Sequence, residues 1–286
     1  MVKSNKARKV ISKFIQYLLL VLVCLVAIIP FIWMVSSSFK TNSEIFTFPP
    51  VWIPREPTTE GYTHLFNTPM YGSTLFIDFG RNSLFVSLTT AIVTVAMAAL
   101  GAYGMSRFRF KGSGLLKYLI LLSQMLPGAL LLIPLYMIMN KFKLIDNHWS
   151  LILAYTSFTL PYCAYLLKSY IDAIPPSIDE AALVDGCNRF TALFRVVFPV
   201  AAPGIVVTFV QAFIMAWNEY MFALTFINSN AKWTLPVALG SFRGQYIVEW
   251  SYLFAGSVLL TIPVLLMFLF FQKWLITGLS SGSVKG

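Results

Sequence analysis

Six apolar stretches, separated by shorter polar intervals, account for most of the chain. A helix that crosses a hydrocarbon core needs about 20 apolar residues. Inside that core every backbone N–H and C=O must be paired within the protein, which favours helices. The pattern therefore predicts an all-α integral membrane protein with six transmembrane helices, at about residues 14–35, 82–105, 118–139, 149–170, 204–227 and 251–276.

Helix-breaking and small residues distinguish two of these stretches. Pro127-Gly128 and Pro134 interrupt the third. Such breaks survive in a membrane where neighbouring protein pairs the freed backbone groups, so we expect this helix to face protein or a cavity. The second stretch carries alanines and Gly101 at residues 96–102, which lets helices approach closely. The proline-rich interval 41–81 is predicted to be an extracytoplasmic loop.

Composition supports the membrane assignment. Charged residues make up 11% of the chain and hydrophobic residues 58%, whereas soluble domains carry about 25% charged residues. The net charge of +10 is spread over short flanks without a long basic stripe, so nucleic acid is not an expected partner. Basic residues are concentrated at 1–13, 107–117 and 168–195, which places these segments in the cytoplasm by the positive-inside rule.

This orientation divides the chain into three parts. We expect a cytoplasmic N-terminus at residues 1–13, a six-span permease domain at 14–276 and a cytoplasmic tail at 277–286. The first apolar run has about 20 residues, longer than the 7–15 of a signal peptide, so it is expected to remain as a membrane helix.

Residues typical of catalysis, metal binding or disulfides are sparse. Cys24 and Cys163 lie in apolar spans and Cys187 in a polar interval, which disfavours a structural disulfide. His64 and His148 are far apart and belong to no metal-ligand spacing. The chain also lacks the Gly-rich loop that cradles nucleotide phosphates. We therefore predict no catalytic residue, no metal site and no enzymatic activity.

The polar interval 175–199 has the pattern of a short capped helix. Ser177 and Glu180 have the spacing of a capping box, in which each side chain accepts the other residue's backbone N–H. Two alanines follow, and Gly186 can adopt the left-handed conformation after a helix. The pattern predicts a helix of about two turns, a turn, and a second short helix that ends at Pro199.

One acidic residue, Glu219, lies within an apolar span, beside Asn218. A charge at a helix centre costs about 2.5–3.5 kcal/mol on insertion scales, so its presence requires an explanation. One hypothesis is a hydrogen bond to a partner helix or a side chain that reaches the interface. The other is that Asn218 and Glu219 line a solute path or gate.

The polar interval also resembles a family signature. Glu180-Ala181-Ala182, three residues, Gly186, nine residues and then Val196-Val197-Phe198-Pro199 resembles the EAA motif of membrane subunits of ATP-binding-cassette importers. Val196 and Phe198 replace the usual Ile and Leu. The carbohydrate, or maltose-type, branch is similar over nearly the whole chain, notably at residues 37–40, 107–112, 217–220 and 282–286.

This resemblance implies a type I importer permease fold with a cytoplasmic coupling helix. The partners it implies are a second homologous permease subunit, an ATPase dimer and an extracytoplasmic solute-binding protein that delivers a sugar or oligosaccharide. ATP and Mg²⁺ would bind to the ATPase, and this chain would carry no cofactor. Localisation would be the bacterial inner membrane, with both termini cytoplasmic.

The same resemblance implies roles for particular residues. Those expected to couple to the ATPase are Glu180, Ala181, Ala182, Asp185, Gly186 and Pro199, and those of the tail expected to contact it are Val284, Lys285 and Gly286. The loop 228–250 would meet the binding protein. Alternatives are a non-sugar such as glycerol phosphate, an acidic oligosaccharide, or a self-sufficient secondary transporter. The last is less favoured because Glu219 is essentially the one titratable group within the spans.

Overall fold

A computed structural model describes residues 2–243 and 248–283, which form helices and connecting loops without a β-strand. The chain divides into two compact units. Unit 1 comprises Met1–Thr68 and Ser241–Leu259, and unit 2 comprises Pro69–Gly240 and Leu260–Gly286.

Four helical stretches of the described residues are long and apolar enough to cross a membrane, and two bent helix pairs raise the number to six if each pair is one span. The bends are 99° between the helices of the third predicted span and 81° at Ala201. The predicted all-α membrane fold is confirmed. The single stretches are Ser12–Ser37, Phe76–Arg107, His148–Asp172 and Trp250–Leu275.

In unit 1, the long helix α1 (Val2–Ser37) leads into an ordered loop. Lys40 is buried there, where it donates to the Val51 carbonyl and lies 4.1 Å from the centroid of the Trp33 ring. Burial lowers the pKa of Lys40, and the Glu44 carboxylate partly opposes that shift. The interval predicted as an extracytoplasmic loop thus accepts a buried contact from Lys40 at Val51 and contains two short helices, α2 (Asn42–Ile45) and α3 (Glu60–Asn67).

Helix α3 packs against the first turns of α14 (Trp250–Ser283). A Cβ atom at Gly61 would lie 3.0 Å from the Ser251 carbonyl oxygen, so only glycine allows this approach without a shift. The His64 ring stacks on Tyr252, with centroids 4.1 Å apart. His64 therefore has a packing role here.

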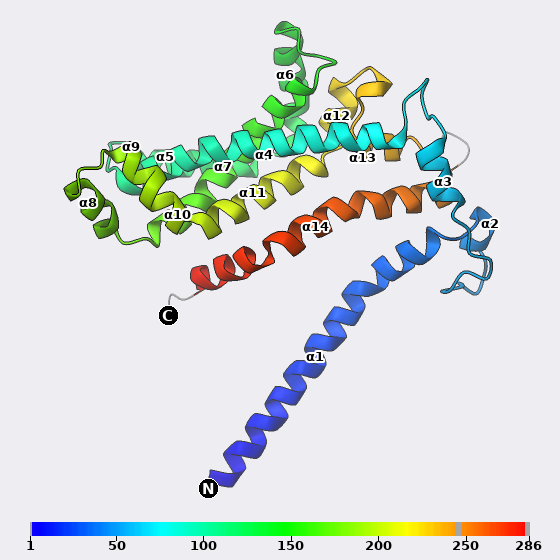
Figure 1. The fold of residues 1–286 in the computed structure, drawn as a ribbon, viewed down its shortest axis with the longest axis horizontal. Coiled ribbons are helices and arrows are strands. Elements are labelled where there is room, and N and C mark those ends of the chain that lie inside the picture. Colours follow the sequence, from blue (N-terminus) through cyan, green and yellow to red (C-terminus); the bar gives the residue numbers. More distant parts are fainter. Residues whose placement is uncertain (1, 244–247, 284–286) are drawn as a thin grey trace. The chain divides into compact units, whose positions relative to one another are not determined.

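Unit 2 is built around three helices that run side by side: α4 (Phe76–Arg107), α7 (His148–Asp172) and α11 (Ala202–Trp217) (Figure 1). The small residues predicted to allow close packing behave as expected in part: Ala98 and Ala102 are fully buried, whereas Gly101 is exposed. The hydroxyl groups of Thr94 and Thr159 lie 3.2 Å apart between α4 and α7.

Two predicted spans are divided in the structure. The third becomes α5 (Ser113–Met125) and α6 (Gly128–Lys141), because Pro127 ends the first helix, whereas Pro134 is accommodated inside α6. The fifth, predicted as one helix over 204–227, breaks after α11 and resumes as α12 (Met221–Phe226). A turn, η2 (Asn230–Lys232), and α13 (Leu235–Gly240) follow.

Candidate functional site

The polar interval between α7 and α11 forms α8 (Pro176–Val184) at one end of the bundle (Figure 1). The predicted capping box is wrong: the helix starts at Pro176, and neither Ser177 nor Glu180 caps it. Proline at the first helical position has no N–H that needs a partner. The helix consequently begins one residue before Ser177, which becomes an interior residue.

The predicted turn after the helix is confirmed. Gly186 has φ +86°, the left-handed conformation. The N–H of Cys187 donates to the Ala182 carbonyl at 3.0 Å, and that of Gly186 donates to the Leu183 carbonyl at 3.1 Å. These two bonds are the Schellman arrangement, which pairs the last carbonyls of a helix. The turn fixes the direction in which the chain leaves α8.

A second helical segment follows, as the sequence predicts. It comprises α9 (Arg189–Ala192), a π-helical turn η1 (Leu193–Val197) and α10 (Phe198–Val200). The Asn188 side chain caps it by accepting the Thr191 N–H at 2.8 Å. The predicted end at Pro199 is one residue early, because proline is here the second residue of α10 and its missing N–H does not interrupt the run.

The predicted coupling residues lie on two different faces of the segment. Glu180, Ala181 and Asp185 are exposed on α8, next to Val184, which is 87% exposed. Ala182, in contrast, is buried. The exposed face of α8 therefore combines two carboxylates with small and apolar surface, which suits contact with another protein. Gly186 and Pro199 are also exposed.

The buried face of α8 carries an ion pair that no local sequence pattern predicted. Arg107, the last residue of α4, pairs through Nε with the Asp179 carboxylate, and the two side chains are 7% and 8% exposed. Arg107 Nη2 also donates to the Ile174 carbonyl at 2.9 Å, and Nη1 donates to the Ser106 hydroxyl at 3.3 Å. The available signal was an arginine that closes an apolar span.

A second ion pair lies within α7, and a hydrogen bond from Ser106 links it to the end of α4. The Ser106 hydroxyl donates to Asp172 at 2.7 Å, and Lys168 pairs with the same carboxylate one turn away on α7. Because Ser106 also accepts from Arg107, the two ion pairs form one connected network. The end of α4 is thereby bonded both to α7 and to α8.

Glu219 lies in the break between α11 and α12, where it makes three hydrogen bonds. The Tyr155 hydroxyl of α7 donates to it at 2.6 Å, and the N–H groups of Phe222 and Ala223 donate at 2.9 and 3.1 Å. Glu219 thus caps α12 and bonds to a partner helix. Asn218 is exposed, and its side chain donates to the Ile214 carbonyl of its own helix at 3.1 Å.

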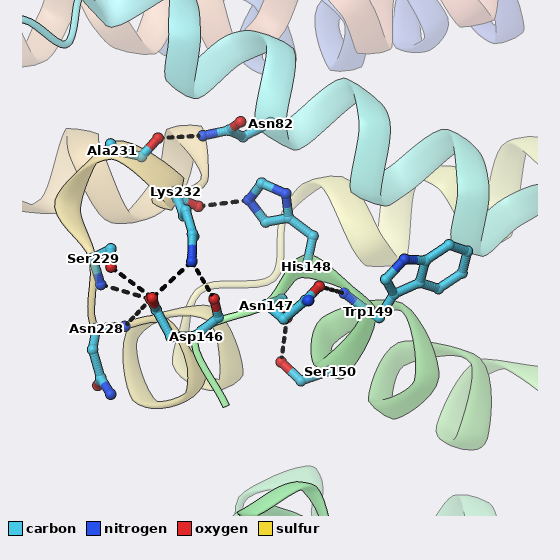
Figure 2. Close-up of polar contacts among 10 residues, drawn as sticks. All are labelled: Asn82, Asp146, Asn147, His148, Trp149, Ser150, Asn228, Ser229, Ala231 and Lys232. Atoms are coloured by element: carbon cyan, nitrogen blue, oxygen red, sulfur yellow. Dashed lines mark hydrogen bonds and ion pairs between the residues drawn. The ribbon is translucent and has the colours of Figure 1, made fainter. Parts of the chain in front are cut away.

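At the opposite end of unit 2, Asp146 organises a polar cluster (Figure 2). It accepts from the N–H groups of Asn228 and Ser229 at 3.0 and 2.7 Å, and Lys232 Nζ lies 2.8 Å from the carboxylate. Burial alone would raise the pKa of Asp146. The hydrogen bonds from Lys232 and Ser229, together with the positive charge of Lys232, hold this pKa well below its ordinary value. The segment after α12 is therefore fixed.

Two further contacts tie this segment to the ends of α4 and α7. The Lys232 carbonyl lies 2.8 Å from His148 Nε2, and Asn82 donates to the Ala231 carbonyl at 3.0 Å (Figure 2). His148, considered for a metal site in the sequence, has a structural partner here. The predicted tail contacts Val284, Lys285 and Gly286 lie outside the described residues.

Comparison with known proteins decides the family. Residues 91–281 match the sequence model of the binding-protein-dependent transport system inner membrane component. The chain belongs to this family. The matched region contains α8 and most of the bundle. The prediction of an importer permease is confirmed.

Full-length relatives support the same assignment. The chain is 36% identical over 279 residues to the inner membrane ABC transporter permease protein YcjP of Escherichia coli, covering 98% of this chain and 99% of the relative. It is 31% identical to the trehalose/maltose transport system permease protein MalG of Thermococcus litoralis, at 97% and 99% coverage. The sulfoquinovosyl glycerol transport system permease protein SmoH of Agrobacterium fabrum is 35% identical, at 90% and 88% coverage.

A solved structure shows the same fold. A chain of a bacterial ABC transporter involved in the import of the acidic polysaccharide alginate superposes with a TM-score of 0.75 at 22% identity, over 93% of this chain and 96% of that one. The family and its relatives are permease proteins, which confirms that this chain is a transporter subunit and not an enzyme.

Proposed function

We propose that this importer permease moves sugars or oligosaccharides and forms half of the translocation path with a second, homologous permease subunit. Relatives named for trehalose, maltose and sulfoquinovosyl glycerol support the solute class. The observation that carries the coupling role is α8, a short helix at the bundle end whose exposed face holds Glu180 and Ala181 of the EAA motif. An ATPase dimer, which binds ATP and Mg²⁺, and a solute-binding protein complete the importer.

Coupling would use the exposed face of α8. Glu180 and Asp185 offer carboxylates to basic residues of the ATPase, and Ala181 allows close approach. The Gly186 turn sets the position of this face relative to the second helical segment. Closure of the ATPase dimer would move α8 and switch the spans between inward-open and outward-open states. The tail residues 284–286 are proposed as a further contact to the ATPase.

The orientation follows from the charge distribution. The positive-inside rule assigns the Lys- and Arg-rich segments 1–13 and 107–117 to one side of the membrane, and Arg107 of the second segment pairs with Asp179 of α8. We propose that this side is the cytoplasm of a bacterial cell, with both termini on it. The Asp146 cluster would then lie on the extracytoplasmic side, where it holds the segment after α12 ready to meet the binding protein.

The break between α11 and α12 is the proposed solute contact. Interrupted helices occur inside membranes where they line a cavity or are buried in protein, and they often form transport sites. Asn218 is exposed at this break and offers an amide to hydroxyl-rich solutes, while Glu219 shapes the break through its three hydrogen bonds. Asn218→Ala is expected to lower uptake while ATPase stimulation by the binding protein persists.

The coupling role is tested with the whole importer in proteoliposomes. Glu180→Lys is expected to insert normally but to abolish ATP-driven uptake and the stimulation of ATPase activity by the binding protein. Glu56→Lys, the same charge change at an exposed loop position, is the matched control and should transport normally. Normal uptake by Glu180→Lys with an unaltered ATPase would refute the assignment of α8.

The solute is tested by uptake of a panel under the same conditions. Neutral disaccharides such as trehalose and maltose should be taken up, and an acidic oligosaccharide and glycerol phosphate serve as competitors of different charge. Uptake of the anionic compounds alone would replace the sugar assignment by one of the alternatives. Gradient-driven uptake by this chain without partners would contradict the importer proposal.

A further inference from the structure

We propose that Arg107 is the positioning residue through which α8 moves the membrane-spanning bundle. The inference rests on the proposed coupling function of α8 and adds the mechanical link on the bundle side. Arg107 is the last residue of α4, the helix that packs along both α7 and α11. Its guanidinium group is the point at which the long central helix is bonded to the buried face of α8.

The guanidinium group makes three contacts in different directions. It pairs with Asp179 on α8, donates to the Ile174 carbonyl just before α8, and donates to Ser106 on its own helix. A planar fork with several donors fixes orientation as well as distance, which a point charge such as that of lysine cannot do. The ends of α4 and α8 are consequently held in one geometry.

The surroundings of the pair make it difficult to replace. Both side chains are more than nine-tenths buried, so salt and water screen their attraction weakly. Asp179 Oδ1 has no hydrogen-bond partner among the described residues. Loss of Arg107 would leave a buried carboxylate without its cation, and α8 would relax away from α4 to hydrate it.

Elsewhere α8 packs against η1 and α9 of the second helical segment. Ala182 is buried and Ile178 is half-buried against a cluster that includes Ala102, Leu167 and Ile171. Apolar contacts have no preferred direction and would let α8 slide against its neighbours, whereas the hydrogen bonds of Arg107 fix its position. The hydrogen bond between Ser106 and Asp172 links α4 to α7, so that a movement of α4 also moves α7. Displacement of α8 would therefore reach two central helices together.

The test uses the complete importer in proteoliposomes and measures solute taken up per ATP hydrolysed. Arg107→Gln is expected to lower this ratio by about tenfold, while the ATPase still co-purifies. Arg107→Lys keeps the charge but loses the fork, so its ratio should fall between those of Arg107→Gln and the unchanged protein. Arg109→Gln is the matched control, an exposed arginine two residues away, and should leave the ratio unchanged.

The outcomes separate this inference from the proposed function. A ratio within about twofold of the unchanged protein for Arg107→Gln would overturn the inference. So would an equal loss in Arg109→Gln. If Glu180→Lys uncouples transport and Arg107→Gln does not, the coupling role of α8 stands and the link alone is refuted. If Arg107→Gln is not recovered from membranes, Asp179→Asn decides, since it should lower the ratio similarly, and a retained ratio refutes the link.

Discussion

The contact between α7 and α11 at Gly204 gives a sharp prediction about packing. A Cβ atom at this position would lie 2.4 Å from Cγ and 2.6 Å from Cβ of Tyr170. These atoms adjoin the α7 backbone, so rotation of the tyrosine ring cannot remove the clash. Gly204→Ala is therefore expected to force the two helices apart at this end of the bundle.

The magnitude follows from two opposing effects. Overpacking a close contact typically costs about 1–3 kcal/mol. Replacing glycine by alanine inside a helix returns up to about 1 kcal/mol of helix propensity. Gly101→Ala isolates the steric effect, because Gly101 is an exposed helical glycine whose added Cβ would meet nothing within 4 Å. Gly204→Ala should be less stable than Gly101→Ala by about 1–3 kcal/mol.

The assay is unfolding of the purified subunit in mixed micelles with increasing denaturing detergent, followed by tryptophan fluorescence. Gly240→Ala provides an intermediate case, because its added Cβ would meet the far end of the Tyr220 ring at 2.9 Å, which can move. The expected order of stability is Gly101→Ala, then Gly240→Ala, then Gly204→Ala. Equal stability of the Gly204 and Gly101 variants would show that the α7–α11 contact is looser than described.

Three further predictions concern other parts of the chain. Asp146→Asn should lower the stability of the protein at neutral pH, because Lys232 loses its partner. Since folding lowers the pKa of Asp146, the stability difference between this variant and the unchanged protein should shrink as the pH falls below the ordinary pKa of 3.8. A stability difference that stays constant in acid would contradict this. At Gly186, asparagine tolerates the left-handed backbone and valine does not. Gly186→Val should therefore be less stable than Gly186→Asn by about 1–2 kcal/mol and should reduce uptake more. Equal uptake by the two variants would refute the role of the turn. Tyr155→Phe removes a donor to Glu219 and should lower stability by about 1–3 kcal/mol, checked by the same detergent titration, and unchanged stability would mean that the bond contributes nothing.

The residues of α8 show how far local sequence information reaches. The Gly186 turn was predictable because a helix end needs a left-handed residue, and only neighbours in sequence take part. The capping box failed for a reason equally local, since Pro176 occupied the first helical position and made the Ser177 cap unnecessary. A helix start at Pro176 and a Ser177 cap were both compatible with the same few residues, and the sequence pattern did not show which of the two forms.

Contacts between residues far apart in the sequence could not be predicted from local patterns. Arg107 and Asp179 are 72 positions apart, and Tyr155 and Glu219 are 64 apart. The sequence showed that Glu219 needed a partner in an apolar span, without showing which helix supplies it. Likewise, nothing local distinguished Ala181, which is exposed, from Ala182, which is buried.

The sequence by itself determined the membrane class, the apolar segments and the EAA signature, because hydropathy and turn chemistry act over a few consecutive residues. Only the tertiary structure decided where the broken helices bend, which face of α8 is free, and which cation neutralises Asp179. Those features depend on which helices pack against each other, because packing brings into contact side chains that are far apart in the sequence.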